Sequence, residues 1–183
     1  MKYNFLVMGL IATSMTAFAG ADTRPVDPRD LDVSILAPLP EDQTPGTEGM
    51  VKFGPAPALS YLQVYAVGSS LYGGWEILPD PYAFITPNDH GGQVLLVAVL
   101  EIGYGGKPIV KMNGSQLAAS ANYRTDSICA FVNGVAYSCS AGQTVIGWLR
   151  YYDVSGNESG VFEHQNTSLN SPWNTLYDRI SIR

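Results

Sequence analysis

Hydrophobic residues along this chain occur in short runs that are separated by glycine, proline and asparagine. Runs of this length, rich in β-branched and aromatic residues, predict strands. The predicted strands are residues 59–67, 75–78, 94–102, 109–112, 128–132, 135–139, 144–154, 161–164 and 175–182. Only residues 115–122 have a helix-like composition. Many short strands without alternating helices predict an all-β fold with little helix, either an antiparallel β-sandwich or a small barrel.

For two of the predicted strands, the residue pattern also predicts the position in a sheet. The run 94–102 is apolar up to Glu101, which predicts a central strand buried on both faces. In the last strand, Ile180 and Ile182 alternate with polar residues, as expected near a sheet edge. Residues 151–160 resemble the hairpin that joins the last two strands of fibronectin-type and immunoglobulin-like sandwiches. That resemblance implies a sandwich of this kind and no activity.

The first nineteen residues have the pattern of a secretory signal peptide. Lys2 is followed by an apolar run over residues 5–12, and Ala17 and Ala19 occupy the small-residue positions of a cleavage site. The alternative, a membrane anchor, needs roughly 20 apolar residues, far more than this run provides. We therefore expect a secreted protein, extracellular or periplasmic, without membrane insertion.

Residues 20–57 differ in composition from the rest of the chain. Seven of the twelve prolines fall in this segment, and its acidic residues outnumber its basic ones. Because proline removes a backbone donor and fixes φ, no ladder or helix is expected to run through the segment. The pattern predicts a leader or linker, largely disordered, in front of a β domain over residues 58–183. A pro-segment that is removed on maturation is the alternative.

The charge of the chain limits the partners that we expect. The formal net charge is −6, and removal of Lys2 with the signal peptide lowers it by one more, to −7. An acidic protein repels the phosphates of nucleic acids and anionic membrane surfaces. We therefore expect no nucleic-acid partner.

The two cysteines, Cys129 and Cys139, flank an Asn133-Gly134 turn signal. In an exported protein an even number of cysteines predicts a disulfide bond. A two-residue turn would place Cys129 opposite Ser138, so the bond requires a longer turn or a β-bulge. A metal or redox pair lacks the required spacing and partner residues.

The chain contains only two histidines, His90 and His164, so few groups are available for acid–base chemistry. His90 follows Asp89 in a polar loop, and a hydrolase would use it as a general base, with Asp89 or a distant carboxylate to orient it. The competing interpretation is a solvated turn, and for His164 a surface position. The spacing predicts no metal site, and we expect no cofactor.

Aromatic residues in or beside the predicted loops offer another kind of site. Flat exposed rings stack on sugars or anchor a protein partner. The candidate binding residues are Tyr72, Trp75, Tyr82, Tyr104 and Trp173. For Trp75 and Trp173, packing in the core or against a loop is the alternative.

Three further segments carry a family resemblance. They are residues 59–69, the Gly74-Trp75-Glu76 sequence, and residues 166–168 together with 172–175. These segments resemble small secreted bacterial proteins of the YolA-like group, whose domain has no assigned function. The resemblance covers residues 59–183 and implies a bacterial secreted protein, with no catalytic residue to transfer.

Taken together, these patterns favour a secreted, non-catalytic β-domain protein over an enzyme. Its expected partner is an extracellular glycan, a cell-envelope component or a protein. The alternatives are a small extracellular hydrolase that uses His90, and a secreted toxin or inhibitor with an acidic pro-segment.

Overall fold

The computed structural model describes residues 27–30, 57–132, 135–139 and 145–183. The predicted signal peptide, most of the predicted leader and the Asn133-Gly134 turn lie outside the described residues.

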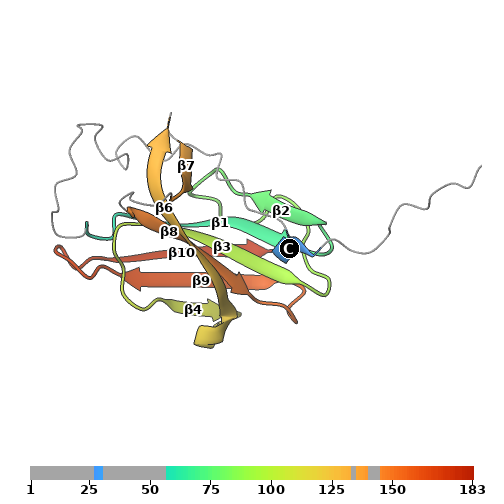
Figure 1. The fold of residues 1–183 in the computed structure, drawn as a ribbon. Coiled ribbons are helices and arrows are strands. Elements are labelled where there is room, and N and C mark those ends of the chain that lie inside the picture. Colours follow the sequence, from blue (N-terminus) through green and yellow to red (C-terminus); the bar gives the residue numbers. More distant parts are fainter. Residues whose placement is uncertain (1–26, 31–56, 133–134, 140–144) are drawn as a thin grey trace, which may run out of the picture.

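The described chain forms two antiparallel sheets that pack face to face as a β-sandwich (Figure 1). The six-stranded sheet has the order β2-β1-β3-β8-β6-β7, and the four-stranded sheet has the order β10-β9-β4-β5. The strands are β1 (Tyr61–Ser69), β2 (Gly74–Ile77), β3 (Leu95–Ile102), β4 (Ile109–Met112), β5 (Ser115–Gln116), β6 (Asn122–Val132), β7 (Val135–Ser138), β8 (Gly147–Asp153), β9 (Gly160–Thr167) and β10 (Thr175–Ile182). Two 3-10 turns, η1 (Pro28–Asp30) and η3 (Ala119–Ala121), are the only helical segments in the described residues. The predicted all-β sandwich is confirmed, and the sheets do not close into a barrel.

Individual predictions for the strands are also confirmed. All eight residues of β3 are buried, and β3 lies between β1 and β8 in the six-stranded sheet. β10 is an edge strand, with Ile180 and Ile182 buried. The hairpin turn between β4 and β5 is formed by Asn113 and Gly114, both with positive φ, as a tight two-residue turn requires.

One prediction about a connection is wrong. β8 and β9 belong to different sheets, so residues 154–159 cross between the layers and do not form the hairpin that the fibronectin-like resemblance implies. Residues 115–122, the segment with a helix-like composition, contain β5, η3 and the first residue of β6 and form no α-helix, in agreement with the expected small helix content. The segment is too short for a helix to nucleate without packing partners, and its first residues pair with β4 instead.

The main core lies between the two sheets. Inward-facing aliphatic residues of β1 and β3, together with Tyr152 of β8, meet Phe162 of β9 and the two isoleucines of β10. A second cluster, which includes Tyr65, Leu100, Leu149 and Tyr151, lies on the other face of the six-stranded sheet. The six-stranded sheet is therefore apolar on both faces, which explains the uninterrupted hydrophobic run of β3.

A short piece of the predicted leader contacts this second face. Pro28 is buried, and its carbonyl accepts a hydrogen bond of 2.9 Å from Trp75 Nε1. Arg29 forms an ion pair with Asp153 at the end of β8. Gly68 permits this approach, because a Cβ at its position would lie 3.1 Å from Pro28 Cβ and 2.8 Å from the Trp75 ring. Residues 27–30 are thus attached to the folded domain.

Cys129 and Cys139 form a disulfide bond, as predicted from their number and position. Val132 pairs with Val135, and a β-bulge lies between Ile128 and Ala130. The bulge shifts the register at Cys129, which is one of the two adjustments predicted to allow this bond.

None of the helical segments among the described residues is long and apolar enough to cross a membrane.

Candidate functional site

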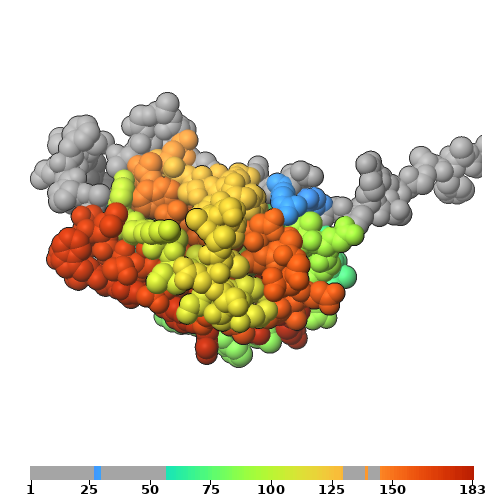
Figure 2. Space-filling view, turned by 90° about the horizontal axis from the view of Figure 1, so that it is seen from below, coloured from blue at the N-terminus to red at the C-terminus, as the bar shows by residue number. Residues whose placement is uncertain are grey.

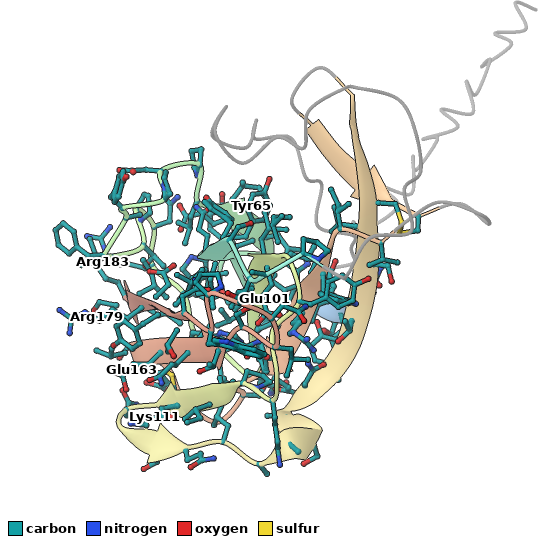
Figure 3. All side chains as sticks on the ribbon, turned by 90° about the vertical axis from the view of Figure 1, so that its left-hand side faces the viewer. Tyr65, Glu101, Lys111, Glu163, Arg179 and Arg183 are labelled. Carbon is teal, nitrogen blue, oxygen red and sulfur yellow. A yellow bond between two sulfur atoms is a disulfide. The ribbon has the colours of Figure 1, made fainter. Side chains whose placement is uncertain are left out.

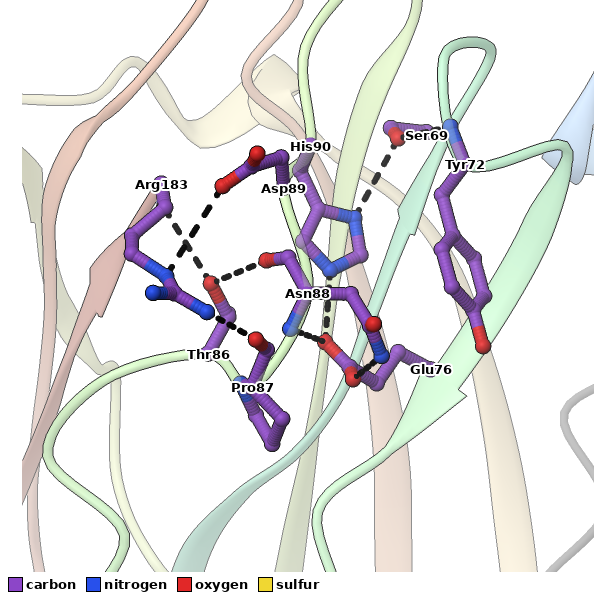
Figure 4. Close-up of polar contacts among 9 residues, drawn as sticks. All are labelled: Ser69, Tyr72, Glu76, Thr86, Pro87, Asn88, Asp89, His90 and Arg183. Atoms are coloured by element: carbon purple, nitrogen blue, oxygen red, sulfur yellow. Dashed lines mark hydrogen bonds and ion pairs between the residues drawn. The ribbon is translucent and has the colours of Figure 1, made fainter.

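His90 is buried beside the hairpin of β1 and β2 (Figure 4). Its Nε2 lies 2.8 Å from Glu76 Oε2, and its Nδ1 lies 3.2 Å from Ser69 Oγ. The interpretation of His90 as part of a solvated turn is therefore wrong. The polar loop folds back onto β1 and β2, where the buried imidazole finds a partner for each ring nitrogen.

Ser69, His90 and Glu76 form a hydroxyl–imidazole–carboxylate series, the order of groups that activates a serine nucleophile. Ser69, however, has no exposed surface, and its Oγ accepts a hydrogen bond from the backbone N–H of Tyr72. The Tyr72 ring lies 5.2 Å from the imidazole, between centroids. A substrate carbonyl cannot reach the Ser69 hydroxyl in this conformation.

The remaining contacts of this network hold the polar loop to the end of the chain. Glu76, and not Asp89, is the carboxylate that orients His90. Asp89 is exposed, and its Oδ1 lies 3.8 Å from Arg183 Nε. The backbone N–H of Arg183 donates to Thr86 Oγ1, and the side chain of Asn88 donates to Glu76. The network therefore ties the loop to β2 and to the C-terminus.

The predicted aromatic binding residues differ in exposure. Tyr82 is 88% exposed, Trp173 is 64% exposed and Tyr72 is 43% exposed. Trp75 and Tyr104 are half-buried. Trp75 packs edge-on against Tyr151 and donates to the Pro28 carbonyl, so it supports the second core cluster.

Tyr104 and Trp173 lie at the same end of the sandwich. Trp173 belongs to the turn 168–174, which forms the left-hand end of the domain in Figure 1. Leu169 of this turn donates its backbone N–H to the Tyr104 carbonyl. The Tyr104 ring packs edge-on against Trp148, 4.8 Å between centroids. Tyr82 lies elsewhere, in the loop between β2 and β3. Two residues later this loop runs beside β10, where Phe84 and Thr86 form backbone hydrogen bonds with Ser181.

The interior between the sheets becomes polar at this same end. The inward-facing rows are Val97, Val99 and Glu101 in β3, Tyr152 and Arg150 in β8 with Val154 directly after it, and Phe162, His164 and Asn166 in β9. All three rows change from apolar to polar residues in the same direction. Figure 3 shows Glu101 near the middle of the domain, whereas Arg179 of β10 projects from its surface.

Glu101 is the centre of this polar cluster and has no exposed surface. Its Oε2 accepts a hydrogen bond of 2.8 Å from Arg150 Nε, and its Oε1 accepts one of 2.8 Å from Asn166 Nδ2. A buried carboxylate needs a cation and further donors, because desolvation of an unpaired charge is expensive. Arg150 and Asn166 supply them.

His164 is also fully buried, so its predicted surface position is wrong. Its Nε2 lies 3.0 Å from the Tyr152 hydroxyl and 3.6 Å from Glu101 Oε1. Burial, and then the charge of Arg150, lower the pKa of His164 to about 3. The imidazole is therefore neutral at physiological pH, and the contact with Glu101 is not an ion pair. Its Nδ1 has no hydrogen-bond partner among the described residues.

Tyr152 connects the polar cluster to a cleft on the surface. Burial is the main cause that raises the pKa of Tyr152, so the group is a phenol and not a phenolate. The cleft has a volume of about 160 Å³ and opens between β4, β5 and η3 on one side and β8 on the other. Its polar lining consists of Lys107, Gln116, Asn122, Arg150 and Tyr152. Its apolar lining consists of Pro108, Val110, Leu117, Ala118 and Ala119.

The cleft lies where the connection from β3 to β4 and the segment from β5 to β6 cross between the sheets. Seen from below in Figure 2, these segments, coloured from yellow-green to yellow, cover the centre of the molecule. Lys107 is exposed at the edge of the cleft and makes no hydrogen bond or ion pair with any described residue. No group of three or more metal-ligating side chains is found in the part of the chain that the structure describes.

Sequence reasoning missed this site. One signal was present, because a lone acidic residue inside a strand that is predicted to be buried requires a partner. Glu101 was that residue, and Arg150 lies on the strand that pairs with β3. The alternation Phe162, His164, Asn166 along β9 was a second signal of polar residues on an inward face.

Comparison with known proteins adds the family. No curated protein matches the chain. A family model matches, and it describes a domain without an assigned function, as expected from the sequence. The likeness to the YolA-like group stays a prediction. The model, a domain of unknown function designated DUF4879, matches residues 54–182. The chain therefore belongs to the DUF4879 family.

Proposed function

We propose that this protein acts after export as a non-catalytic binding domain, and that the cleft between β4, β5, η3 and β8 is its binding site. Its target is an extracellular glycan, a component of the cell envelope or a protein. The observation that carries the proposal is the cleft itself, in which cationic, amide and hydroxyl groups converge above a buried polar cluster. Concave sites of this kind, with few polar groups on an apolar wall, are typical of ligand binding.

The protonation states in and below the cleft support binding over catalysis. His164 is neutral and fully buried, and Tyr152 is a phenol whose pKa is raised mainly by burial. Glu101 is held by Arg150 and Asn166. Neither His164 nor Tyr152 exchanges a proton readily near pH 7, and all three side chains hold a fixed hydrogen-bond geometry.

Export is supported by the disulfide between Cys129 and Cys139, because such bonds persist in oxidising compartments. The predicted signal peptide provides the route.

The proposal is tested with glycan and peptide arrays on the full mature chain, residues 20–183. The cleft is filled by Ala118→Trp, and Ser120→Trp is the matched control, because Ser120 belongs to the same turn and does not line the cleft. We expect binding to one ligand class that is lost in Ala118→Trp and retained in Ser120→Trp. Binding that survives Ala118→Trp, or no binding to any member of the arrays, contradicts the proposal.

A hydrolase that uses His90 is the second candidate, because Ser69, His90 and Glu76 are aligned in the order that such an enzyme needs. It requires the β1–β2 turn to move and expose Ser69. A panel of ester, peptide and glycoside substrates compares the unmodified protein with Ser69→Ala. Turnover that disappears in Ser69→Ala, with unchanged thermal stability, favours the hydrolase over the binding domain.

A further inference from the structure

We propose that the cleft binds a carboxylate group that is attached to a short apolar group. This inference rests on the proposed function and names the ligand class of the same site. It follows from the charges, the donors and the size of the cleft.

The charge balance favours a single negative charge. Two cations line the cleft, Lys107 and Arg150. Among the described residues, the only carboxylate in contact with them is Glu101, which is bonded to Arg150. One positive charge therefore remains uncompensated within the cleft. The protein as a whole carries a net charge of −6, so this is a local cationic site in an acidic protein. A monoanion matches it, whereas a phosphate dianion does not.

Arg150 is positioned in advance for an acidic ligand. Glu101 holds its Nε at 2.8 Å, and its guanidinium carbon lies 5.8 Å from the centroid of the Trp148 ring. The two terminal nitrogens make no hydrogen bond to any described residue. A guanidinium fixed in this way presents a planar pair of donors, the geometry that binds a carboxylate through two parallel hydrogen bonds. Because the side chain is already ordered, ligand binding loses little additional conformational entropy.

The other polar groups that line the cleft are hydrogen-bond donors or amides that can donate or accept. The Tyr152 phenol and the side chains of Asn122 and Gln116 line the same cleft. Burial and Arg150 keep His164 neutral behind Tyr152, so it adds no second uncompensated cation that would favour a dianion. The site therefore resembles a hydrogen-bonding cup around one anionic group.

The opposite wall of the cleft indicates the chemical character of the part of the ligand that is not the carboxylate. Pro108, Val110, Leu117 and Ala118 give an apolar surface. A volume of about 160 Å³ is close to that of a cavity that holds benzene, so the part of the ligand inside the cleft has roughly six non-hydrogen atoms, the carboxylate included. A free branched or aromatic acid has this chemistry, and so does an apolar residue at the C-terminus of a peptide.

The test uses 4-methylpentanoate and its neutral counterpart 4-methylpentanamide as probes of the full mature chain, with binding followed by titration in NMR spectra. The peptides Gly-Gly-Leu and Gly-Gly-Leu-amide form the second arm and distinguish a peptide terminus from a free acid. We expect each carboxylate to bind at least roughly tenfold more tightly than its amide, as expected for charge-assisted hydrogen bonds. Inorganic phosphate is expected to compete poorly.

Lys107→Ala and Lys111→Ala form a matched pair of variants. Lys107 lies in the β3–β4 connection and Lys111 lies four residues later in β4. Lys111 is opposite Glu163 in the register of the four-stranded sheet and does not line the cleft. We expect Lys107→Ala to weaken carboxylate binding roughly three- to tenfold and Lys111→Ala to leave it unchanged.

The outcomes separate this inference from the proposed function. If acid and amide bind equally and both are lost in Ala118→Trp, the carboxylate class is wrong and the binding site stands. If neither probe pair binds, the carboxylate class is also wrong, and the arrays alone decide the function. Tighter binding of phosphate than of 4-methylpentanoate overturns the inference as well.

Discussion

Acidification tests the buried polar cluster through His164. In the unfolded chain this histidine has an ordinary pKa of 6.5, whereas burial and Arg150 lower the pKa to about 3 in the folded protein. Between these two values the unfolded chain binds one more proton than the folded chain. The contribution of His164 to stability is therefore fully present above pH 6.5 and decreases as the pH falls toward 3.

The magnitude follows from the unfolded-state pKa alone as long as the folded imidazole stays neutral. Protonation of His164 stabilises the unfolded state by about 1.4 kcal/mol for each pH unit below 6.5. At pH 5 this stabilisation amounts to about 2 kcal/mol. Four other groups face His164. Glu101 and Arg150 neutralise each other, Tyr152 donates or accepts a hydrogen bond, and Asp178 pairs with His164 in the register of β9 and β10.

Asp178 changes the free energy of unfolding with pH in the opposite direction to His164, so the measurement requires a control. Its pKa is raised, mainly by burial, so its protonation supports the folded state at low pH. Comparison of the unmodified protein with His164→Gln cancels this effect, because Asp178 is present in both proteins. Glutamine retains a group that can hydrogen-bond to Tyr152 and does not titrate.

The assay is urea denaturation of both proteins at pH 8 and pH 5. We expect the free energy of unfolding of the unmodified protein, relative to His164→Gln, to fall by about 2 kcal/mol between these two values. Identical pH dependence of the two proteins would refute the reasoning, and so would an NMR titration of His164 with a midpoint near 6.5 in the folded state. Either result would mean that the imidazole is hydrated or paired with Glu101.

Three further changes test the fold by urea denaturation. Replacement of Cys129 and Cys139 by serine is expected to lower the free energy of unfolding by about 3 kcal/mol, since the bond closes a loop with a sequence separation of 10; an unchanged value contradicts this. Arg150→Met is expected to lower it by about 3–5 kcal/mol, because Glu101 is left buried without a cation. Adding Glu101→Gln to that variant should recover part of the loss, and a double-mutant cycle without coupling argues against the pair. Gly68→Ala is expected to lower it by about 1–3 kcal/mol through contact of the new Cβ with the Trp75 ring, and to increase quenching of tryptophan fluorescence by acrylamide.

The strands were predictable because their signals are local. An uninterrupted apolar run such as β3 is buried on both faces wherever the sheet lies, and Asn113-Gly114 selects a tight turn through its own backbone preferences. A bulge or a longer turn near the cysteines was predictable, because the register of a two-residue turn conflicts with the reach of a disulfide bond, and the structure has the bulge. Each of these features depends only on residues that are close in sequence or covalently linked.

Connections between layers were not predictable in this way. A short turn such as residues 154–159 joins two strands of one sheet or crosses to the facing sheet with similar local chemistry. The choice depends on which partner the following strand finds. β9 pairs with β4 and β10, and that pairing, formed over long sequence separations, decides that the turn crosses between layers.

The buried histidines show the same limit at the level of the site. His90 follows several turn residues and His164 follows an acidic residue, so both have the local sequence of exposed positions. Their burial depends on distant partners. Glu76 for His90 comes from β2, and Tyr152 for His164 comes from β8.

The polar ends of β3, β8 and β9 meet only because of the sandwich topology. The antiparallel register of β3 and β8 makes Glu101 and Arg150 diagonal neighbours, because Val99 pairs with Arg150 and Glu101 pairs with Trp148. Asn166 reaches the same carboxylate from the facing sheet. An apolar core could fill this end of the sandwich at lower desolvation cost, since buried ion pairs seldom stabilise a fold more than hydrophobic residues of similar volume. The cluster lies directly behind the wall of the cleft that carries Arg150. The physical reason that we assign to the cluster is therefore that it orders Arg150 for a ligand, and not that it stabilises the fold.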